Sequence, residues 1–261
     1  MNRLRKILLS ILGEEKYLSL LASSFQRLYK TGRLGKSYQD IYFLKSIIRE
    51  GYCCIDIGAH LGYYTLELSR LAGHSGKVYA IEPVTKFFYT LKNLLKKKHI
   101  QNVEVYQLAL GGDSEYVEMG IPKVDNVKKF GYARVMQSNM ELEYVESERV
   151  KNEKGDDLFA NLDRLDFIKC DVEGLEVPVF TSMLKTIAKH LPILLCELAD
   201  KNERIKLYEM LLPLDYKVFF LENKRLYSLN VYADMGTISH NHYFIPLQHR
   251  ERLKELISQQ S

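Results

Sequence analysis

The feature that most constrains the fold is a glycine-containing turn between two apolar stretches, the second of which ends in an acid, Glu82. Tyr52–Ile57 is a short apolar run, as expected for a buried parallel strand. Gly58 and Gly62 let the backbone approach a ligand closely, and Leu61–Leu71 has apolar residues at helical spacing. This order of strand, glycine turn, helix and strand predicts a nucleoside-binding unit, with the helix N-terminus facing the ligand.

The spacing of the glycines indicates which nucleoside binds. Dinucleotide sites carry G-x-G-x-x-G, whereas Gly58 and Gly62 are separated by three residues and Asp56 precedes them. The charge of Asp56 would repel a pyrophosphate but suits the ammonium of a methionine moiety, directly or through water. Glu82 falls where a carboxylate accepts hydrogen bonds from both ribose hydroxyls. S-adenosylmethionine therefore fits this loop better than NAD does.

Three motifs in order carry a resemblance to a known family. They are D-I-G-A-H-L-G-Y-Y-T at 56–65, A-I-E-P at 80–83 and D-F-I-K-C-D-V-E-G at 166–174. Together they resemble the FkbM-type methyltransferases, which use S-adenosylmethionine, over roughly residues 50–248. His60 stands where Asn is frequent in that family. The resemblance implies methyl transfer to an oxygen, with a hydroxyl of a sugar or another small molecule as the acceptor.

The motifs and the strand order also indicate which residues bind the cofactor. Ala109 is included because it lies near the end of the strand predicted over 103–110, where the adenine edge should rest. The expected cofactor-binding residues are Asp56, Gly58, Ala59, His60, Gly62, Tyr64, Thr65, Glu82, Pro83 and Ala109.

The candidate catalytic residues follow the fourth and fifth predicted strands, whose carboxyl ends border the ligand in a parallel sheet. Asp171 and Glu173 come after the fourth strand, and Glu197 closes the fifth. Asp171 or Glu173 could remove the proton of the acceptor hydroxyl as a general base. Alternatively, the three acids could hold a divalent metal ion, a reading that we do not favour. His60 is a further candidate base.

Structural roles compete with these chemical ones. Asp171 could cap the helix that follows it, and Glu173 could pair with Lys169. Packing is the more common role for a histidine in the position of His60. The H-N-H stretch at 240–242 precedes the last predicted strand and could line the acceptor site if that strand is antiparallel.

The rest of the chain continues the alternation of helices and strands that a doubly wound sheet requires. The patterns predict helices at 84–98, 175–190 and 204–212, strands at 103–110, 165–170, 193–197, 216–221 and 243–245, and short strands and loops over 116–150. The last two strands have no crossover helix between them, so we expect them to be antiparallel. The predicted fold is α/β, Rossmann-like and doubly wound, with a mostly parallel seven-stranded sheet and an antiparallel last strand: the class I methyltransferase fold.

Length and composition fit one enzyme-sized domain. The chain has 261 residues, of which 46% are hydrophobic, and no linker rich in Gly, Ser or Pro divides it. We expect residues 51–261 to form the domain that binds S-adenosylmethionine, and residues 1–50 to form a helical extension packed on it. The net charge is only +4, and the lysines at 92–98 fit a solvated helix end. Nucleic acid is therefore not an expected partner.

The remaining expectations concern location and alternative functions. No run of about 18 apolar residues occurs, so no membrane-spanning helix is predicted. The apolar segment 7–12 lacks a signal-peptide cleavage site, which favours the cytoplasm, and it should pack on the core or, alternatively, rest on a membrane surface. The four cysteines are expected to be buried and reduced. The alternative functions are a non-catalytic nucleoside-binding protein and, less favoured by the glycine spacing, a dinucleotide-dependent oxidoreductase.

Overall fold

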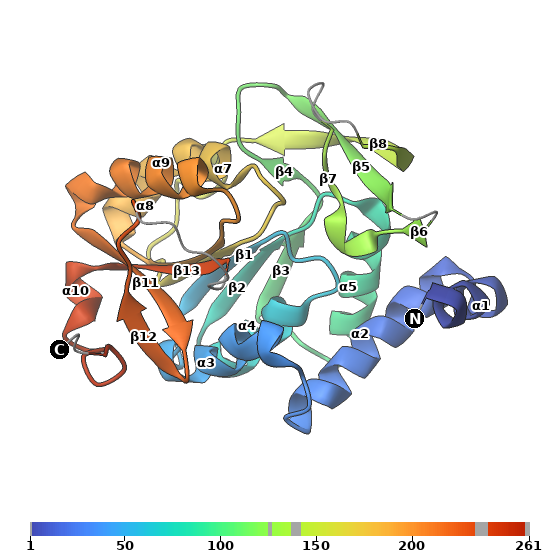
Figure 1. The fold of residues 1–261 in the computed structure, drawn as a ribbon, viewed down its shortest axis with the longest axis horizontal. Helices are drawn as coiled ribbons and strands as arrows, with labels where there is room; N and C mark the ends of the chain where they lie inside the picture. The colour runs from blue at the N-terminus through green and yellow to red at the C-terminus, as the bar shows by residue number, and fades with distance from the viewer. Residues whose placement is uncertain (1, 125–126, 137–141, 233–239, 259–261) are drawn as a thin grey trace.

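An eight-stranded sheet in the order β12-β11-β13-β10-β9-β1-β2-β3 forms the centre of the molecule (Figure 1). The computed structural model describes residues 2–124, 127–136, 142–232 and 240–258. The strands of this sheet are β1 Cys53–Ile57, β2 Lys77–Ile81, β3 Val103–Tyr106, β9 Phe167–Cys170, β10 Ile193–Glu197, β11 Tyr216–Glu222, β12 Arg225–Ser228 and β13 Asn241–Pro246. Strands β1, β2, β3, β9 and β10 are parallel, whereas β13 is antiparallel to β10 and β11. The prediction of a doubly wound sheet with an antiparallel last strand is confirmed.

Helices cover both faces of the sheet, because successive side chains of a strand point to opposite sides (Figure 1). One face carries α3 Gln39–Ile47, α4 Tyr63–Ala72 and α5 Thr85–Lys97, and the other carries α7 Glu176–Ser182, α8 Leu184–His190 and α9 Lys201–Leu211. In β1, Cys54 packs with the side chains of α3 and α4, and the next residue, Ile55, packs with those of α7, α8 and α9. The central strands are therefore mostly apolar and do not alternate, although Asp56 and Lys169 are buried in them.

Two predicted elements are divided in the structure. The strand predicted over 103–110 is in fact β3 in the main sheet and β4 Ala109–Leu110, which pairs with β8 instead. The helix predicted over 175–190 breaks at Met183, whose φ of −127° is not helical, and so gives α7 and α8. Met183 is fully buried, so the apolar pattern continues through the break and conceals it.

The described residues of 109–153 build a second sheet, here called the insertion sheet, where the sequence predicted short strands and loops over 116–150. Its long antiparallel strands are β5 Tyr116–Val124 and β8 Tyr144–Glu153, accompanied by β4, β6 Val127–Lys128 and β7 Arg134–Val135. Half-buried and exposed residues alternate along most of β8. Because Glu146 and Glu148 lie on its half-buried side and charged residues also occur on its exposed side, this strand lacks the apolar run that would have revealed it.

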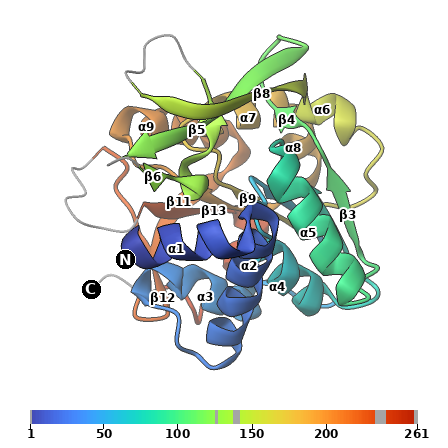
Figure 2. The ribbon, with the colours of Figure 1, turned by 90° about the vertical axis from the view of Figure 1, so that its right-hand side faces the viewer.

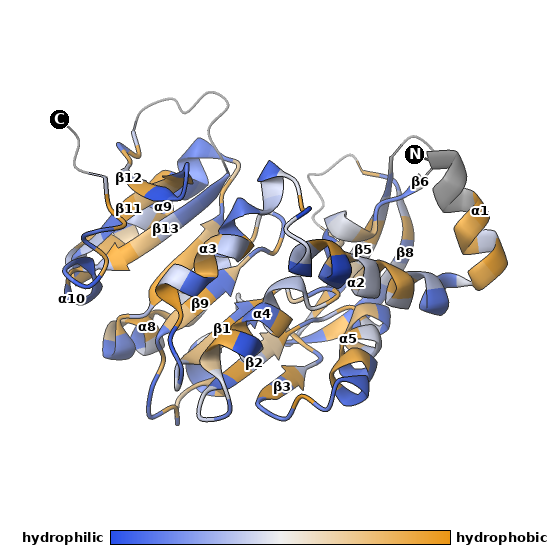
Figure 3. Cartoon of the chain, turned by 90° about the horizontal axis from the view of Figure 1, so that it is seen from below, coloured by the Kyte–Doolittle hydropathy of each residue, from blue (hydrophilic) through white to orange (hydrophobic). Residues whose placement is uncertain are grey.

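Two N-terminal helices, α1 Asn2–Leu12 and α2 Glu14–Lys30, lie beside α5 and the insertion sheet (Figures 1 and 2). Tyr17 and Leu18 of α2 are buried in one apolar cluster with Phe87 of α5 and Phe130 of the insertion sheet region. Figure 3 shows that α1, at the margin of the molecule, carries hydrophobic residues. Leu8 and Leu9 of α1 pack against the same cluster.

A cluster of charges joins α2 to the insertion sheet. Lys86 of α5 and Lys128 of β6 each form ion pairs with Glu14 of α2 and Glu146 of β8. The Nζ atom of Lys86 lies 2.8 Å from a carboxylate oxygen of Glu14, and that of Lys128 lies 3.3 Å from the other. Four segments distant in the sequence therefore meet at this charge cluster.

The C-terminal part adds a strand that the sequence patterns did not reveal. Strand β12 pairs with β11 through a turn at Asn223 and Lys224, both of which have positive φ. The sheet consequently has one strand more than predicted. The remaining short helices are α6 Gly155–Leu158 and α10 Leu247–Arg250, with 3-10 turns at Lys36–Tyr38, Phe130–Tyr132 and Leu212–Leu214.

Two further expectations concern membranes and cysteines. Over the described ranges, none of the helices combines the length and the apolarity needed to cross a membrane. All four cysteines are free and buried, as predicted.

Candidate active site

The candidate site lies at the carboxyl ends of β1 and β9, the neighbouring strands from which the chain proceeds in opposite directions across the sheet. A cavity of about 880 Å³ opens there, within the range of roughly 300–1,000 Å³ that is usual for small-molecule sites. The predicted site residues that line it are Gly58, Ala59, His60, Tyr64, Glu82, Pro83, Ala109, Asp171 and Glu173. Asp56, Gly62 and Thr65 lie outside the lining and support the loop after β1.

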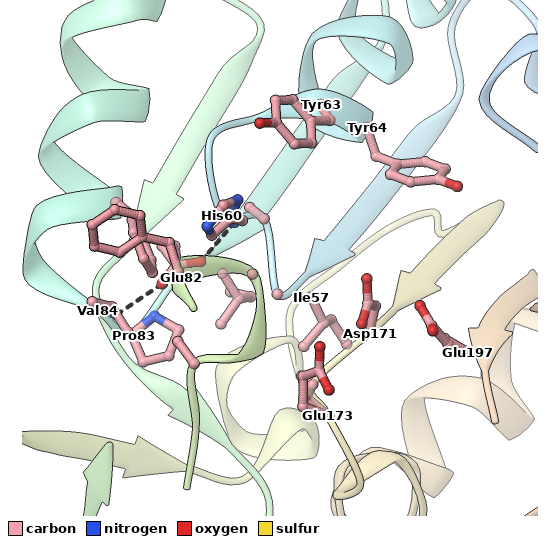
Figure 4. Close-up of a pocket in the computed structure, with 18 of the residues that line it drawn as sticks. Ile57, His60, Tyr63, Tyr64, Glu82, Pro83, Val84, Asp171, Glu173 and Glu197 are labelled. Atoms are coloured by element: carbon pink, nitrogen blue, oxygen red, sulfur yellow. Dashed lines mark hydrogen bonds between the residues drawn. The ribbon is translucent and has the colours of Figure 1, made fainter. Parts of the chain in front are cut away.

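Glu82 is fixed in the cavity by backbone amides (Figure 4). Its Oε2 accepts a hydrogen bond from the His60 amide at 2.6 Å, and its Oε1 accepts one from the Val84 amide at 2.8 Å. Burial raises the pKa of this carboxyl to about 7, although both amides act to lower it. Because each carboxylate oxygen has two lone pairs, acceptor capacity remains for a ribose hydroxyl at each.

The glycines of the loop after β1 allow close contact within the protein. Gly58 has a φ of +77°, and a Cβ atom there would lie 1.9 Å from the carbonyl oxygen of Asp171. Gly62 has a φ of +80°, and its Cβ would lie 2.4 Å from the side chain of Leu91 on α5. The sequence argument placed a ligand against Gly58, but the space that a side chain would occupy there is filled by the backbone of the loop after β9.

Asp56 is buried beneath the cavity and is not exposed to it. Its Oδ2 accepts a hydrogen bond from the Thr65 hydroxyl at 2.6 Å, which ties the end of β1 to the first turn of α4. Burial raises the pKa of Asp56, while Lys169 and the Thr65 hydroxyl act to lower it. A contact between Asp56 and a methionine ammonium therefore requires a mediating water.

Lys169, in the middle of β9, is the buried cation of the site. Its Nζ lies 3.2 Å from Asp171 Oδ2 and 3.7 Å from Asp56 Oδ1, and it donates a hydrogen bond to the Gly58 carbonyl at 3.2 Å. Burial alone would lower the pKa of Lys169, but the carboxylates of Asp171 and Asp56 outweigh it and hold the pKa above its usual range. Lys169 therefore stays charged and orients Asp171.

Glu173 has a partner from the insertion sheet. Its Oε2 lies 2.6 Å from Nη2 of Arg134 on β7, so the suggested pair of Glu173 with Lys169 is wrong. Burial first, and then the charge of Asp171, raises the pKa of Glu173 to about 7, against the opposing effect of Arg134. Figure 4 shows the carboxylates of Asp171, Glu173 and Glu197 gathered on one side of the cavity.

The suggestion that Asp171 caps the following helix is also wrong. Helix α7 begins at Glu176, its N-cap residue is Leu175, and no side chain caps it. The loop is held instead by the Glu176 carboxylate, which accepts hydrogen bonds from the amides of Val172 and Gly174. Asp171 is therefore available to face the cavity.

The two histidines considered from the sequence have different positions. His60 lines the cavity, and its ring packs edge-on against Phe87 at 4.3 Å between centroids. Burial lowers its pKa to about 4, with Lys169 acting in the same direction, so the ring is neutral. Of the stretch 240–242, Asn241 lines the cavity, as expected. His242 is buried in β13 and does not line the cavity, so the expectation is wrong for this residue.

Neither Lys169 nor Arg134 was among the residues predicted for the site. A lysine within an otherwise apolar strand, F-I-K-C, is a signal that could have identified the first. Arg134 gave no such signal, because it lies 39 residues before Glu173.

The acidic side chains were also considered as metal ligands. Within the part of the chain that the structure describes, no three His, Cys, Asp or Glu side chains are grouped so that they could hold a metal ion. Asp171 and Glu173 instead face the cations Lys169 and Arg134, whose charges would repel a metal ion.

Comparison with known proteins agrees with this site. A family model described as the Methyltransferase FkbM domain matches residues 56–229, which contain the glycine loop, Glu82 and the acidic residues after β9. The chain belongs to the FkbM methyltransferase family. The family resemblance noted in the sequence is thereby confirmed.

This FkbM-family chain is also similar to two individual proteins, one in structure and one in sequence. The crystal structure of methyltransferase FkbM from Methylobacillus flagellatus KT is 18% identical, with a TM-score of 0.53 over 88% of this chain and 50% of that one. This likeness shows the class I methyltransferase fold. A protein-L-isoaspartate O-methyltransferase from Methanocella arvoryzae is 36% identical over 59 residues, which are 23% of this chain and 31% of that relative. The match thus covers half of the Methylobacillus flagellatus chain and about a third of the Methanocella arvoryzae protein.

Proposed function

We propose that this protein transfers the methyl group of S-adenosylmethionine to a hydroxyl oxygen of a small molecule or a sugar. The observation that carries the proposal is a single cavity that has Glu82 on one side and the carboxylates of Asp171 and Glu173 on the other (Figure 4). Membership of the FkbM family supports the same chemistry. We also propose that residues 51–261 form the cofactor-binding domain and residues 1–50 an extension of it.

The residues present fit the cofactor. The Glu82 carboxylate is held by two backbone amides at the end of β2, where ribose hydroxyls can donate to it. Ala109 and Leu110 of β4 give the cavity an apolar edge suited to an adenine. When bound, S-adenosylmethionine supplies a methyl group that is transferred as its carbon–sulfur bond breaks, leaving S-adenosylhomocysteine.

Glu173 is the base that this arrangement favours. A general base is most effective when its pKa lies near the working pH, and burial raises the pKa of Glu173 to about 7, as it does that of Glu197, which also lines the cavity. The acceptor hydroxyl would pass its proton to Glu173 as its oxygen bonds to the methyl carbon. Asp171, whose Oδ2 lies 3.2 Å from Nζ of Lys169, would accept a hydrogen bond from the acceptor and orient it. His60, neutral and buried, is the second candidate base.

The test has two parts. Calorimetric titration with S-adenosylmethionine, S-adenosylhomocysteine and NAD should show binding of the first two ligands only. A screen for S-adenosylhomocysteine release over hydroxylated small molecules and sugars, with RNA and protein as further arms, should give turnover with a hydroxylated small molecule. Binding without turnover in any arm would favour the nucleoside-binding alternative, and NAD binding would favour the oxidoreductase. The absence of a nucleic-acid partner and the cytoplasmic location stay predictions.

A further inference from the structure

The cavity has a second, apolar wall that neither the cofactor residues nor the acidic residues account for. Its side chains come from the N-terminal helices, from α5 and from the insertion sheet region. They are Leu8, Leu21, Phe87, Met119, Phe130 and Val135. This apolar wall is continuous with the acidic side of the same cavity, where Asp171 and Glu173 lie.

The apolar wall is a packed surface. Phe130 contacts both Phe87, at 6.2 Å between ring centroids, and Tyr17 of α2, at 6.3 Å. Phe87 in turn packs on the ring of His60 at 4.3 Å. The charge cluster of Glu14, Lys86, Lys128 and Glu146 ties the start of α2 to the insertion sheet beside this surface. The wall is thus preformed by three parts of the chain.

The acidic side of the cavity favours a polar group on the acceptor, and the apolar side favours an apolar one. A hydroxyl must reach Asp171 and Glu173, but a wholly polar acceptor would leave the apolar wall in contact with water. Burial of apolar area is favourable by about 25 cal/mol per Å², so a molecule with an apolar body would bind more tightly than a polar one of equal size. Water trapped against such a wall has few hydrogen-bond partners.

We infer that the acceptor is amphiphilic: a hydroxyl carried by a molecule with a substantial aliphatic or aromatic body, which lies against the wall formed by α1, α2, α5 and the insertion sheet. The inference rests on the proposed methyl transfer, because the same cavity must hold the cofactor. It narrows the acceptor from any sugar or small molecule to one with an apolar part.

The experiment measures the affinity of the protein for alcohols whose alkyl chains differ in length. Protein saturated with S-adenosylhomocysteine is titrated calorimetrically with 1-butanol, 1-hexanol and 1-octanol, and with glucose as the polar probe. We expect the dissociation constant to fall about fourfold per added methylene group, and glucose to bind more weakly than any of the alcohols. Leu21→Ser and Val135→Thr, each of which places a hydroxyl in the wall, should flatten this dependence.

Leu28→Ser is the matched control, because Leu28 also lies on α2 but is 44% exposed and does not line the cavity. It should keep the wild-type dependence on chain length. Equal affinity for all four probes, or a dependence that persists in both wall variants, would overturn the inference. The titration with S-adenosylhomocysteine alone separates the two proposals. If S-adenosylhomocysteine does not bind, methyl transfer itself is refuted. If it binds but the affinity for the alcohols does not depend on their chain length, only the amphiphilic acceptor is refuted.

Discussion

Three carboxylates around the cavity have different surroundings, and their chemistry follows from these. Glu82 accepts two backbone amides and faces the position expected for the ribose. Asp171 pairs with the buried Lys169, and Glu173 pairs with the part-buried Arg134. Burial raises the pKa of both Glu82 and Glu173 to about 7. The proposed roles in cofactor binding, orientation and proton transfer rest on these different partners.

Glu82→Ala tests the cofactor position. We expect S-adenosylmethionine binding to weaken by about 2–4 kcal/mol, because two charge-assisted hydrogen bonds to the ribose are lost in a desolvated site. Calorimetric titration measures the change, and Glu222→Ala, at the exposed end of β11, is the control. Unchanged affinity in a folded Glu82→Ala protein would remove Glu82 from the site.

The pH dependence of turnover tests the base. Glu173 must be deprotonated to accept a proton, so with both substrates saturating, kcat should fall about tenfold per pH unit below its pKa of about 7 and level off above it. Glu173→Gln should lower kcat by about 100-fold and abolish this dependence. If the dependence survives in Glu173→Gln and disappears in Glu197→Gln instead, the base is Glu197.

Asp171→Asn tests the orienting carboxylate. We expect kcat to fall about 100-fold with S-adenosylmethionine affinity nearly intact, because Asn keeps the shape but not the charge. Urea unfolding should show a loss of about 1–3 kcal/mol, since the buried Lys169 loses its nearer partner. Adding Lys169→Met should restore stability without restoring turnover.

Full activity in Asp171→Asn would contradict this role and direct attention to His60. Treatment of the wild-type protein with a chelator completes the test. We expect no change in activity; loss with chelator and recovery with Mg²⁺ would assign the acids to a metal site.

At the scale of elements, the two loops after β1 and β9 act as one unit. Gly58 touches the carbonyl of Asp171, and Lys169 donates to the carbonyl of Gly58. Any side chain at Gly58 must therefore displace the loop that carries Asp171 and Glu173. The glycine loop thus supports the loop that carries the acidic residues.

Gly58→Ala should abolish measurable S-adenosylmethionine binding and turnover together, because its Cβ would lie 1.9 Å from the Asp171 carbonyl oxygen. Gly112→Ala is the control, since Gly112 also has a positive φ, +64°, but nothing lies within 4 Å of its Cβ. That variant should show only backbone strain, about 1 kcal/mol in urea unfolding. Normal binding by Gly58→Ala would mean that the two loops move apart freely.

At the scale of the whole molecule, the cavity is completed by segments outside the doubly wound core. Helices α1 and α2 and the insertion sheet supply most of its apolar wall, and Arg134 of the insertion sheet supplies the partner of Glu173. The charge cluster around Glu14 holds these segments together. The doubly wound core, the helices α1 and α2 and the insertion sheet therefore line one cavity.

Glu14→Gln tests that connection. Ion pairs that are partly exposed contribute about 1 kcal/mol or less, so hydrogen exchange of the α2 amides should quicken by up to about fivefold at low salt. The effect should vanish near 1 M salt, where the Debye length is about 3 Å. Glu15→Gln, at the exposed next position, is the control. Equal exchange in both variants would show that the charge cluster does not hold α2.

The central elements of the fold could be predicted because their signals are local. The run from β1 through Gly58 and Gly62 to α4 and β2 has apolar periodicity, turn residues and an acid at fixed short spacings. Family motifs lie on this same run and on β9 with the loop that follows it. Burial on both faces makes such strands continuous apolar runs, which a sequence displays directly.

What only the tertiary structure decided are contacts between distant segments. Lys169 lies 111 residues from Gly58, Arg134 lies 39 residues from Glu173, and Glu14 lies 114 residues from Lys128. Strand pairing and burial also decide the division of the strand at β4, the break of the helix at Met183 and the strands of the insertion sheet. The local sequence pattern shows none of these. Side-chain pairing across a fold depends on where each backbone passes, and local periodicity carries no information about that. The sequence by itself determined the class of fold and the nucleoside loop, and packing decided the partners of each carboxylate and the apolar wall of the cavity.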